Sequence, residues 1–143
     1  MQVSAGGDRT CVLGFDHAVV CVGLDVAKPG VVDKFKLIST GPLQGCGLRN
    51  DIDAVSCWDR TGTNVLTKGG VFLQVDTALS HVCAVTSGNA ITCWGTDLVG
   101  QAAPPGGRLF SQVTSGLAHA CALGVDQVVV CWGDDAKGQA SPP

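Results

Sequence analysis

The chain of 143 residues contains no glutamate, no tyrosine and a single methionine. All twelve acidic residues are therefore aspartate, and glycine, with twenty copies, is more frequent than any charged residue. Aspartate and glycine favour turns, whereas valine and other β-branched residues favour pleated strands. This composition predicts an all-β protein whose strands are joined by tight turns.

Clusters of positive charge and long apolar runs are also missing. The formal net charge is −3, and the nine lysine and arginine residues are scattered along the chain. Nucleic-acid binding needs clustered basic residues that displace counterions, so this distribution argues against a nucleic-acid partner. No apolar run approaches the roughly 18 residues that cross a bilayer, so we expect no membrane insertion. The first residues lack the basic and apolar regions of a signal peptide.

Motifs that carry catalytic chemistry are absent as well. The sequence has no glycine-rich phosphate loop, no Cys-x-x-Cys redox pair, no metal-binding histidine pair and no Gly-x-Ser-x-Gly elbow. His81 and His119 occupy one position of the repeat described below, where the other copies have Arg9 and Gln44. A position that tolerates such different residues predicts a hydrogen-bonded structural histidine that braces a turn. We therefore predict no enzymatic activity, no catalytic residue, no bound metal and no cofactor.

Other polar residues have structural explanations too. His17 is expected at the tip of a hairpin, as a solvated turn residue. The close carboxylate pairs are Asp51 with Asp53 and Asp134 with Asp135. Turn aspartates commonly cap their own backbone. We expect this role for them in preference to a calcium site or a general acid.

The sequence does contain one unit repeated four times, and each copy has two cysteines roughly ten residues apart. Equivalent cysteines of successive units are 35 to 38 residues apart, which is the length of a single supersecondary unit. The repeats span approximately 1–35, 36–72, 73–110 and 111–143. The cysteine pairs are Cys11 and Cys21, Cys46 and Cys57, Cys83 and Cys93, and Cys121 and Cys131.

Between the cysteines of each unit, two apolar runs flank a polar turn, which predicts a β-hairpin. The turns fall at 15–17 in the first unit, 87–89 in the third and 125–127 in the fourth, with about three residues each. The second unit has one extra residue, so a four-residue loop or a bulge is expected near Asp51. Because the second run of each hairpin is apolar on both faces, the sheets are expected to be sandwiched between neighbours.

Aromatic residues recur at two positions of the unit. Tryptophan follows the second cysteine in three copies, with Val22 in its place in the first, and phenylalanine precedes the first strand in three copies. We predict that these side chains form the core between neighbouring sheets and do not stack on a ligand. They are Trp58, Trp94 and Trp132, and Phe35, Phe72 and Phe110.

The cysteines could bind metal or form disulfides. Zinc sites typically use closely spaced cysteines that converge on one ion, whereas each pair here lies on the facing strands of one hairpin. Directly opposed residues of an antiparallel pair have Cα atoms about 4.5 Å apart, a distance that a disulfide spans. We therefore predict four disulfides, one within each hairpin. Such bonds persist in oxidising compartments, which predicts an extracellular or cell-surface location.

The unit reads Val-x-x-Gly-x-x-His-x-Cys, a hairpin, Cys-Trp-Gly and Gly-Gln-x-x-Pro-Pro, most completely in the third and fourth copies. In this pattern it resembles the regulator of chromosome condensation repeat, in the cysteine-paired bacterial and plant-surface variety that includes crinkly-type receptor kinase ectodomains. The resemblance implies a β-propeller of four-stranded blades, usually seven, that works by binding. This chain departs from it with four units. The first two lack the Gly-Gln-Pro-Pro ending, and the second has Asp59 where glycine is expected.

Unless four blades close a ring, the first and last units each present an uncovered apolar face. The leading hypothesis is a non-catalytic extracellular module that binds copies of itself head to tail and forms a larger assembly or filament. The alternative is a fragment of a seven-bladed secreted propeller that binds a ligand or an enzyme, as a lectin or an inhibitor does. A nuclear exchange factor is disfavoured because it would need free thiols. No N-glycosylation sequon is present, and the sequence names no glycan ligand.

Overall fold

The computed structural model describes residues 1–24 and 33–142, and every regular element in this part of the chain is a strand. None of these residues belongs to a helix that could cross a membrane. In chain order the strands are β1 (Gln2–Gly6), β2 (Arg9–Leu13), β3 (Val19–Gly23), β4 (Phe35–Thr40), β5 (Gln44–Arg49), β6 (Ala54–Asp59), β7 (Asn64–Gly69), β8 (Phe72–Thr77), β9 (His81–Thr86), β10 (Ile91–Gly95), β11 (Phe110–Ser115), β12 (His119–Gly124) and β13 (Val129–Gly133).

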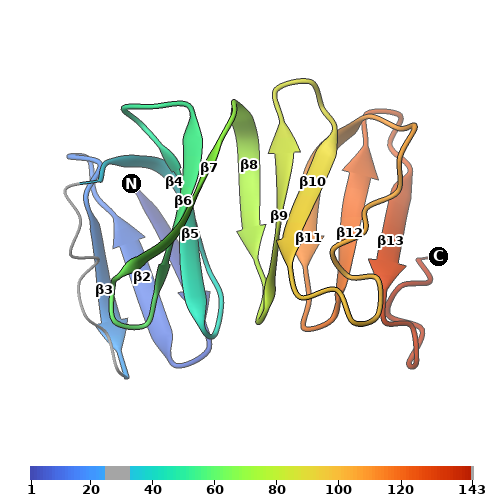
Figure 1. The fold of residues 1–143 in the computed structure, drawn as a ribbon, viewed down its shortest axis with the longest axis horizontal. Helices are drawn as coiled ribbons and strands as arrows, with labels where there is room; N and C mark the ends of the chain where they lie inside the picture. Colours follow the sequence, from blue (N-terminus) through green and yellow to red (C-terminus); the bar gives the residue numbers. More distant parts are fainter. Residues whose placement is uncertain (25–32, 143) are drawn as a thin grey trace.

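The strands form four antiparallel sheets that stand side by side in chain order (Figure 1). We number these sheets as blades 1 to 4: β1-β2-β3, β4-β5-β6-β7, β8-β9-β10 and β11-β12-β13. The first strand of each blade contacts the first strand of the next, so β1, β4, β8 and β11 form the inner edge of the array. The blades do not close into a ring (Figure 1). The predicted all-β fold with propeller-type blades and an incomplete ring is confirmed.

The hairpin turns of blades 1, 3 and 4 have the predicted three residues. In each turn the third residue has a positive φ, with values of 65° at His17, 62° at Asn89 and 68° at Gln127. A residue in this left-handed conformation lets a short loop follow the right-handed twist of the two strands. In blade 2, residues 50–53 form the longer loop that the extra residue predicted.

Among the described residues only blade 2 has a fourth strand, which departs from the four-stranded blades that the family resemblance implies. The outer segments of the third and fourth units contain Gly-Gln-x-x-Pro-Pro, and proline has no N–H to donate to a neighbouring strand. The second unit has a proline-free segment at this place, and that segment pairs with β6 as β7. The outer part of the first unit, 25–32, lies outside the described residues.

The residue at the glycine position of the Cys-Trp-Gly motif also distinguishes blade 2, which has a fourth strand, from blade 3, which has three. Gly95 has a φ of 107°, and a Cβ atom there would lie 2.5 Å from the carbonyl oxygen of Ser80. Only glycine fits this conformation and this close approach. Asp59 occupies the position in blade 2 without a positive φ, and its carboxylate accepts hydrogen bonds from the backbone N–H groups of Thr61 and Thr63. The chain therefore continues from β6 through a capped turn into β7.

Each blade contains one disulfide between its second and third strands, as predicted. The two cysteines of a pair are directly opposite in the strand register, and their Cα atoms are 4.0 to 4.1 Å apart. All eight cysteines are used in this way. The bonds therefore link neighbouring strands within a blade, and none of them links one blade to the next.

The core lies in three layers between the blades, and the layers share one pattern. The disulfide of one blade packs with the phenylalanine that begins the first strand of the next blade. The layers contain Cys11, Cys21 and Phe35; Cys46, Cys57 and Phe72; and Cys83, Cys93 and Phe110. Each tryptophan lies in the layer that precedes its own blade, with Trp58 and Trp132 buried and Trp94 partly buried.

The pattern gives each blade two different faces, one with the disulfide and one with the residues that cover the disulfide of the preceding blade. At the two ends of the array one face of each kind stays open. Val20 and Val22 on β3 are 50% and 63% exposed, which is the uncovered apolar face expected of the first unit in an array that does not close. No preceding blade packs on these valines within the described residues.

The position of a disulfide in the array should determine how much it stabilises the fold. We compare Cys46→Ala/Cys57→Ala, in a core layer, with Cys121→Ala/Cys131→Ala, on the open face of blade 4. Loops of about eleven residues predict a loss of about 2–3 kcal/mol for either pair, through the unfolded chain. The first pair should lose about 1–2 kcal/mol more, because it also leaves a cavity in the core. Urea denaturation measures both losses, and equal values would contradict the layered core.

Candidate interaction surface

The histidines that sequence analysis singled out do not form a catalytic group. His81 is fully buried, and neither ring nitrogen has a hydrogen-bond partner in the part of the chain that the structure describes. The prediction of a hydrogen-bonded ring is therefore wrong, although the backbone carbonyl of His81 does accept a hydrogen bond from the N–H of Ala78 in the turn. Burial lowers the pKa of His81, which favours the neutral ring.

His17 is more than a solvated turn residue, which corrects the expectation for this position. Its Nδ1 lies 2.9 Å from the carbonyl oxygen of Phe35 in blade 2, and its own carbonyl accepts a hydrogen bond from the Phe35 N–H. Asn89 makes the same two contacts with Phe110 in blade 4. The left-handed turn residue therefore connects the tip of a hairpin to the first strand of the following blade.

The close carboxylate pairs are engaged in local structure. Asp134 accepts a hydrogen bond from the N–H of Ala136, and Asp135 accepts one from the N–H of Ala140 and one from the hydroxyl of Ser141. These are the backbone caps that were expected. No group of acidic, histidine or cysteine residues in the described ranges could hold a metal ion.

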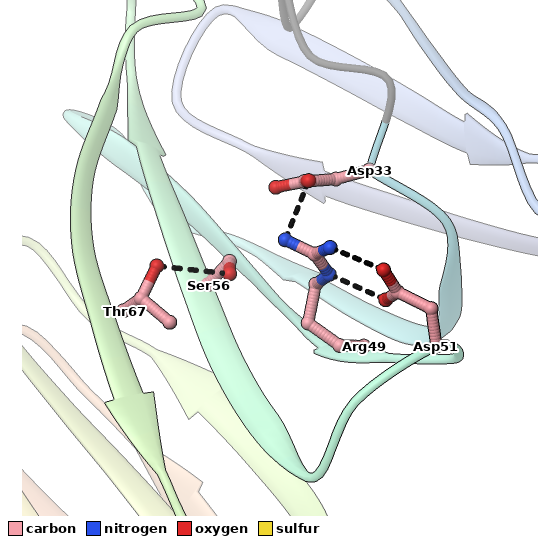
Figure 2. A network of polar contacts seen from close by, with 5 residues as sticks. All are labelled: Asp33, Arg49, Asp51, Ser56 and Thr67. Atoms are coloured by element: carbon pink, nitrogen blue, oxygen red, sulfur yellow. Dashed lines mark hydrogen bonds and ion pairs between the residues drawn. The ribbon is translucent and has the colours of Figure 1, made fainter.

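Asp51 takes part in an ion-pair network at the turn of the blade 2 hairpin (Figure 2). Arg49 donates to both carboxylate oxygens of Asp51, from Nε at 2.7 Å and from Nη2 at 2.5 Å, and its Nη1 lies 2.5 Å from Asp33. The hydrogen bonds from Arg49 lower the pKa of Asp51 from 3.8 to about 2. Figure 2 also shows Ser56 facing Thr67 across β6 and β7, with 3.2 Å between their hydroxyl oxygens.

Glutamine side chains connect the inner strands of consecutive blades. Gln2 on β1 donates from Nε2 to the carbonyl oxygen of Ile38 on β4 at 2.8 Å, and its Oε1 accepts from the Ile38 N–H at 2.9 Å. Gln74 on β8 makes the same pair of bonds to Val113 on β11, both at 2.9 Å. We call this arrangement the amide contact. One side chain satisfies both backbone groups that an inner strand turns toward the preceding blade.

A second polar position, two residues further along the inner strand, adds a single bond at each junction. The hydroxyl of Ser4 accepts from the Thr40 N–H, and that of Ser39 accepts from the Thr77 N–H, both at 2.9 Å. Asp76 completes the series, because its carboxylate accepts from the N–H of Ser115 and also from the hydroxyl of Ser39. The inner strands are therefore joined by side chains that all point in the same direction along the chain.

Sequence analysis did not identify these residues, although the repeat alignment contains their signal. The aliphatic residue of each inner strand is flanked by a glutamine or leucine and by a small polar or acidic residue. The triplets are Gln2-Val3-Ser4, Leu37-Ile38-Ser39, Gln74-Val75-Asp76 and Gln112-Val113-Thr114. Alternation of this kind normally indicates a solvent-exposed face. Only the stacking of the blades shows that these polar groups meet the backbone of a neighbouring strand.

The two ends of the array present different faces. The head face is the open face of blade 1, and its side chains form two rows across the strands: Val3, Val12 and Val20, and Ala5, Thr10 and Val22. The tail face is the open face of blade 4, and its rows are Gln112, Leu123 and Val129, and Thr114, Cys121 and Cys131. None of the residues in these four rows is charged. A shallow apolar hollow of about 260 Å³ lies on the tail face.

A cavity of about 380 Å³ lies where the turns that follow the inner strands of all four blades converge. Glycine, alanine, threonine and leucine provide most of its lining. Asp76 is its only ionisable residue, and both oxygens of that carboxylate already accept hydrogen bonds. The cavity therefore offers no free acid or base.

No family model and no curated protein sequence matches the chain. Solved structures do match it. The CRINKLY WD40 ectodomain of the Arabidopsis thaliana receptor kinase ACR4 is 25% identical, covering 92% of this chain and 48% of its own, with a TM-score of 0.78. The ectodomain of the Physcomitrella patens receptor kinase CR4 is 27% identical, covering 92% and 39%, with a TM-score of 0.76. Prp20p from Saccharomyces cerevisiae is 15% identical, covering 99% and 46%, with a TM-score of 0.80.

These likenesses define the class of protein. The four sheets are β-propeller blades similar to those of the regulator of chromosome condensation and of the crinkly receptor ectodomains, as the repeat pattern indicated. The chain spans less than half the length of each of these three structures.

The network around Arg49 should make the stability of the fold depend on pH. Because folding lowers the pKa of Asp51 from 3.8 to about 2, its contribution is present above about pH 4 and is lost as the pH falls through about 2. The difference in free energy of unfolding between the wild type and Asp51→Asn should therefore shrink between pH 5 and pH 2. Urea denaturation at each pH measures this difference, and a difference that stays constant would exclude the ion pair as its source.

Proposed function

We propose that this chain is a non-catalytic extracellular interaction module that binds copies of itself head to tail. The proposal rests on one observation. In each of the three layers between blades, a disulfide of one blade is covered by residues of the next blade. The tail face has such a disulfide, and the head face has the residues that would cover one. The partner of the tail face of one copy is the head face of another.

The head face has the positions that, in the other blades, cover a disulfide. Val3 corresponds to Ile38, Val75 and Val113, all of which are buried against the preceding blade. In the same way, the Cys121–Cys131 disulfide on the tail face corresponds to three disulfides that a following blade covers. The rows of both faces are uncharged and rich in aliphatic side chains. Burying them against each other removes apolar surface from water without leaving an unpaired charge.

A contact between two different faces adds each copy in the same orientation. Such an interface is heterologous, and it produces a closed ring when the rotation between copies closes and a filament when it does not. The three internal junctions already place successive blades side by side in chain order (Figure 1). Self-association extends the array with the same geometry.

The extracellular location rests on the disulfides and on the likeness to the two receptor ectodomains. Disulfides persist in oxidising compartments and are rare in the cytosol. A protein partner is also supported by the similar structures, because Prp20p is described with binding properties to Gsp1p and histones.

A second candidate function is favoured by the coverage of the similar structures. The chain spans 48% and 39% of the two receptor ectodomains, as part of a larger propeller would. In that case further blades of the same polypeptide cover the head and tail faces, and the complete ring is a secreted module that binds a ligand or an enzyme. The two candidates differ in whether the purified chain associates with itself.

Complementation between two blocked variants tests the proposal. Val20→Asp places a charge on the head face, and Val129→Asp places the same charge on the tail face, at valines that are 50% and 46% exposed. The wild type should form particles larger than a monomer, whereas each variant alone should stay smaller, because a buried unpaired charge is costly. A mixture of the two should form a one-to-one dimer through the intact tail of one and the intact head of the other. Light scattering coupled to gel filtration measures all four samples.

The two valines give a matched comparison, because the substitution, the strand position and the exposure are similar. A monomeric wild type, or a mixture that stays monomeric, would contradict head-to-tail association. A wild-type monomer would favour the second candidate. A Val20→Asp variant that still forms large assemblies alone would place the contact elsewhere on the molecule.

A further inference from the structure

We infer that Gln112 and Thr114 set the strand register of the head-to-tail contact by binding the backbone of β1 in the next copy. This inference rests on the proposed self-association and names the polar contacts that would specify it. It also assigns a binding role to two exposed residues of β11.

The first step is the equivalence of positions along the inner strands. Gln112 precedes Val113 as Gln2 precedes Val3 and as Gln74 precedes Val75. Gln2 and Gln74 each make an amide contact with the following blade. Gln112 occupies this position in the last blade, where its side chain is exposed on the tail face and makes no hydrogen bond within the described residues.

Thr114 repeats the second polar position. Ser4, Ser39 and Asp76 occupy it in the other blades, and each accepts a hydrogen bond from a backbone N–H of the next inner strand. Thr114 has a hydroxyl oxygen that can accept in the same way, and it too is exposed without a bonded partner among residues 1–24 and 33–142.

The second step is the acceptor strand. Val3 pairs with Val12 in the register in which Ile38 pairs with Gly47 and Val113 pairs with Ala122. The N–H and carbonyl groups of Ile38 and Val113 point away from their own blades, toward the glutamine of the preceding one.

The same register leaves the backbone groups of Val3 open on the head face. Ala5 corresponds to Thr40 and Ser115, whose N–H groups bind the second polar position. Gln112 would therefore bind Val3 of the next copy, and Thr114 would bind Ala5.

The amide contact mainly fixes which residues of the two inner strands face each other, and it contributes less to the strength of the contact between blades. Blade 2 has Leu37 in place of the glutamine, and its junction with blade 3 still forms, with Leu37 packed against the core layer. Two blades can thus stay together without the amide contact, through apolar packing and the bond from the second polar position. A glutamine that bonds to both the N–H and the carbonyl of one residue excludes an offset of one residue, because such a shift turns those groups to the other side. Apolar faces of rows of valines provide no such discrimination.

The blocked variants described above isolate a single head-to-tail contact and allow a direct test. Gln112→Glu, introduced into the Val20→Asp copy, keeps the size of the side chain but replaces the donating amide with a carboxylate that faces the carbonyl of Val3. We expect its dissociation constant for the Val129→Asp copy to rise at least about 10-fold, because the carbonyl partner is left unpaired. Ala136→Glu in the same copy is the control, since it adds the same charge to an exposed turn of the same blade. Thr114→Val should weaken binding less, by about 3-fold.

Amide hydrogen exchange provides a second measurement, because apolar contact alone would not protect a particular backbone amide through a hydrogen bond. The Val3 and Ala5 amides of the Val129→Asp copy should exchange more slowly in the complex, and the protection of Val3 should be lost with Gln112→Glu. If the two blocked copies bind but neither affinity nor Val3 protection depends on Gln112, this inference is wrong while the proposed function stands. If the two blocked copies do not bind at all, the proposed function itself fails.

Discussion

The structure depends on the contact between the disulfide of one blade and the phenylalanine of the next. A small sheet of short strands is stable only when it has an apolar face to bury. Here each hairpin is closed by a covalent bond, and that bond forms part of an apolar surface onto which the following blade folds. Cys11, Cys46 and Cys83 are fully buried in these layers. The disulfides thus shape each blade and also provide the surface on which the next blade packs.

The inner edge of the array is organised by polar contacts that complement this apolar packing. An inner strand is an edge strand, and unpaired backbone groups on an edge are a template for unwanted pairing with other chains. Gln2 and Gln74 satisfy those groups from the preceding blade, and Ser4, Ser39 and Asp76 add one bond at each junction. The contacts are directional, because in each of them the side chain comes from the earlier blade and the backbone group from the later one. The array therefore has a polarity, and its two ends are chemically different.

That polarity is the physical basis for the proposed function. An array with identical ends would form pairs and stop, whereas different and complementary ends add copies in one direction. The chemistry of the two ends is that of the internal junctions: valines on one side, and a disulfide with a glutamine and a threonine on the other. The likeness to receptor ectodomains and to Prp20p shows that such blades also build larger propellers.

The sequence alone determined the features that depend on local spacing. The period of the repeat, the hairpins, the three-residue turns and the pairing of Cys46 with Cys57 follow from residues about ten positions apart, whose geometry a single hairpin fixes. The phenylalanines and tryptophans were placed between the blades for the same reason, since their phase in the repeat is regular.

The tertiary structure decided the features that depend on how one blade stacks on another. The partners of Gln2, Gln74 and His17 lie 36, 39 and 18 residues away in the chain, and no local pattern fixes which atoms meet over such separations. The unpaired ring of His81 also became visible only with the blades in place. Spacing determines what each blade is, and the stacking of blades determines which of its groups are satisfied and which remain available for binding.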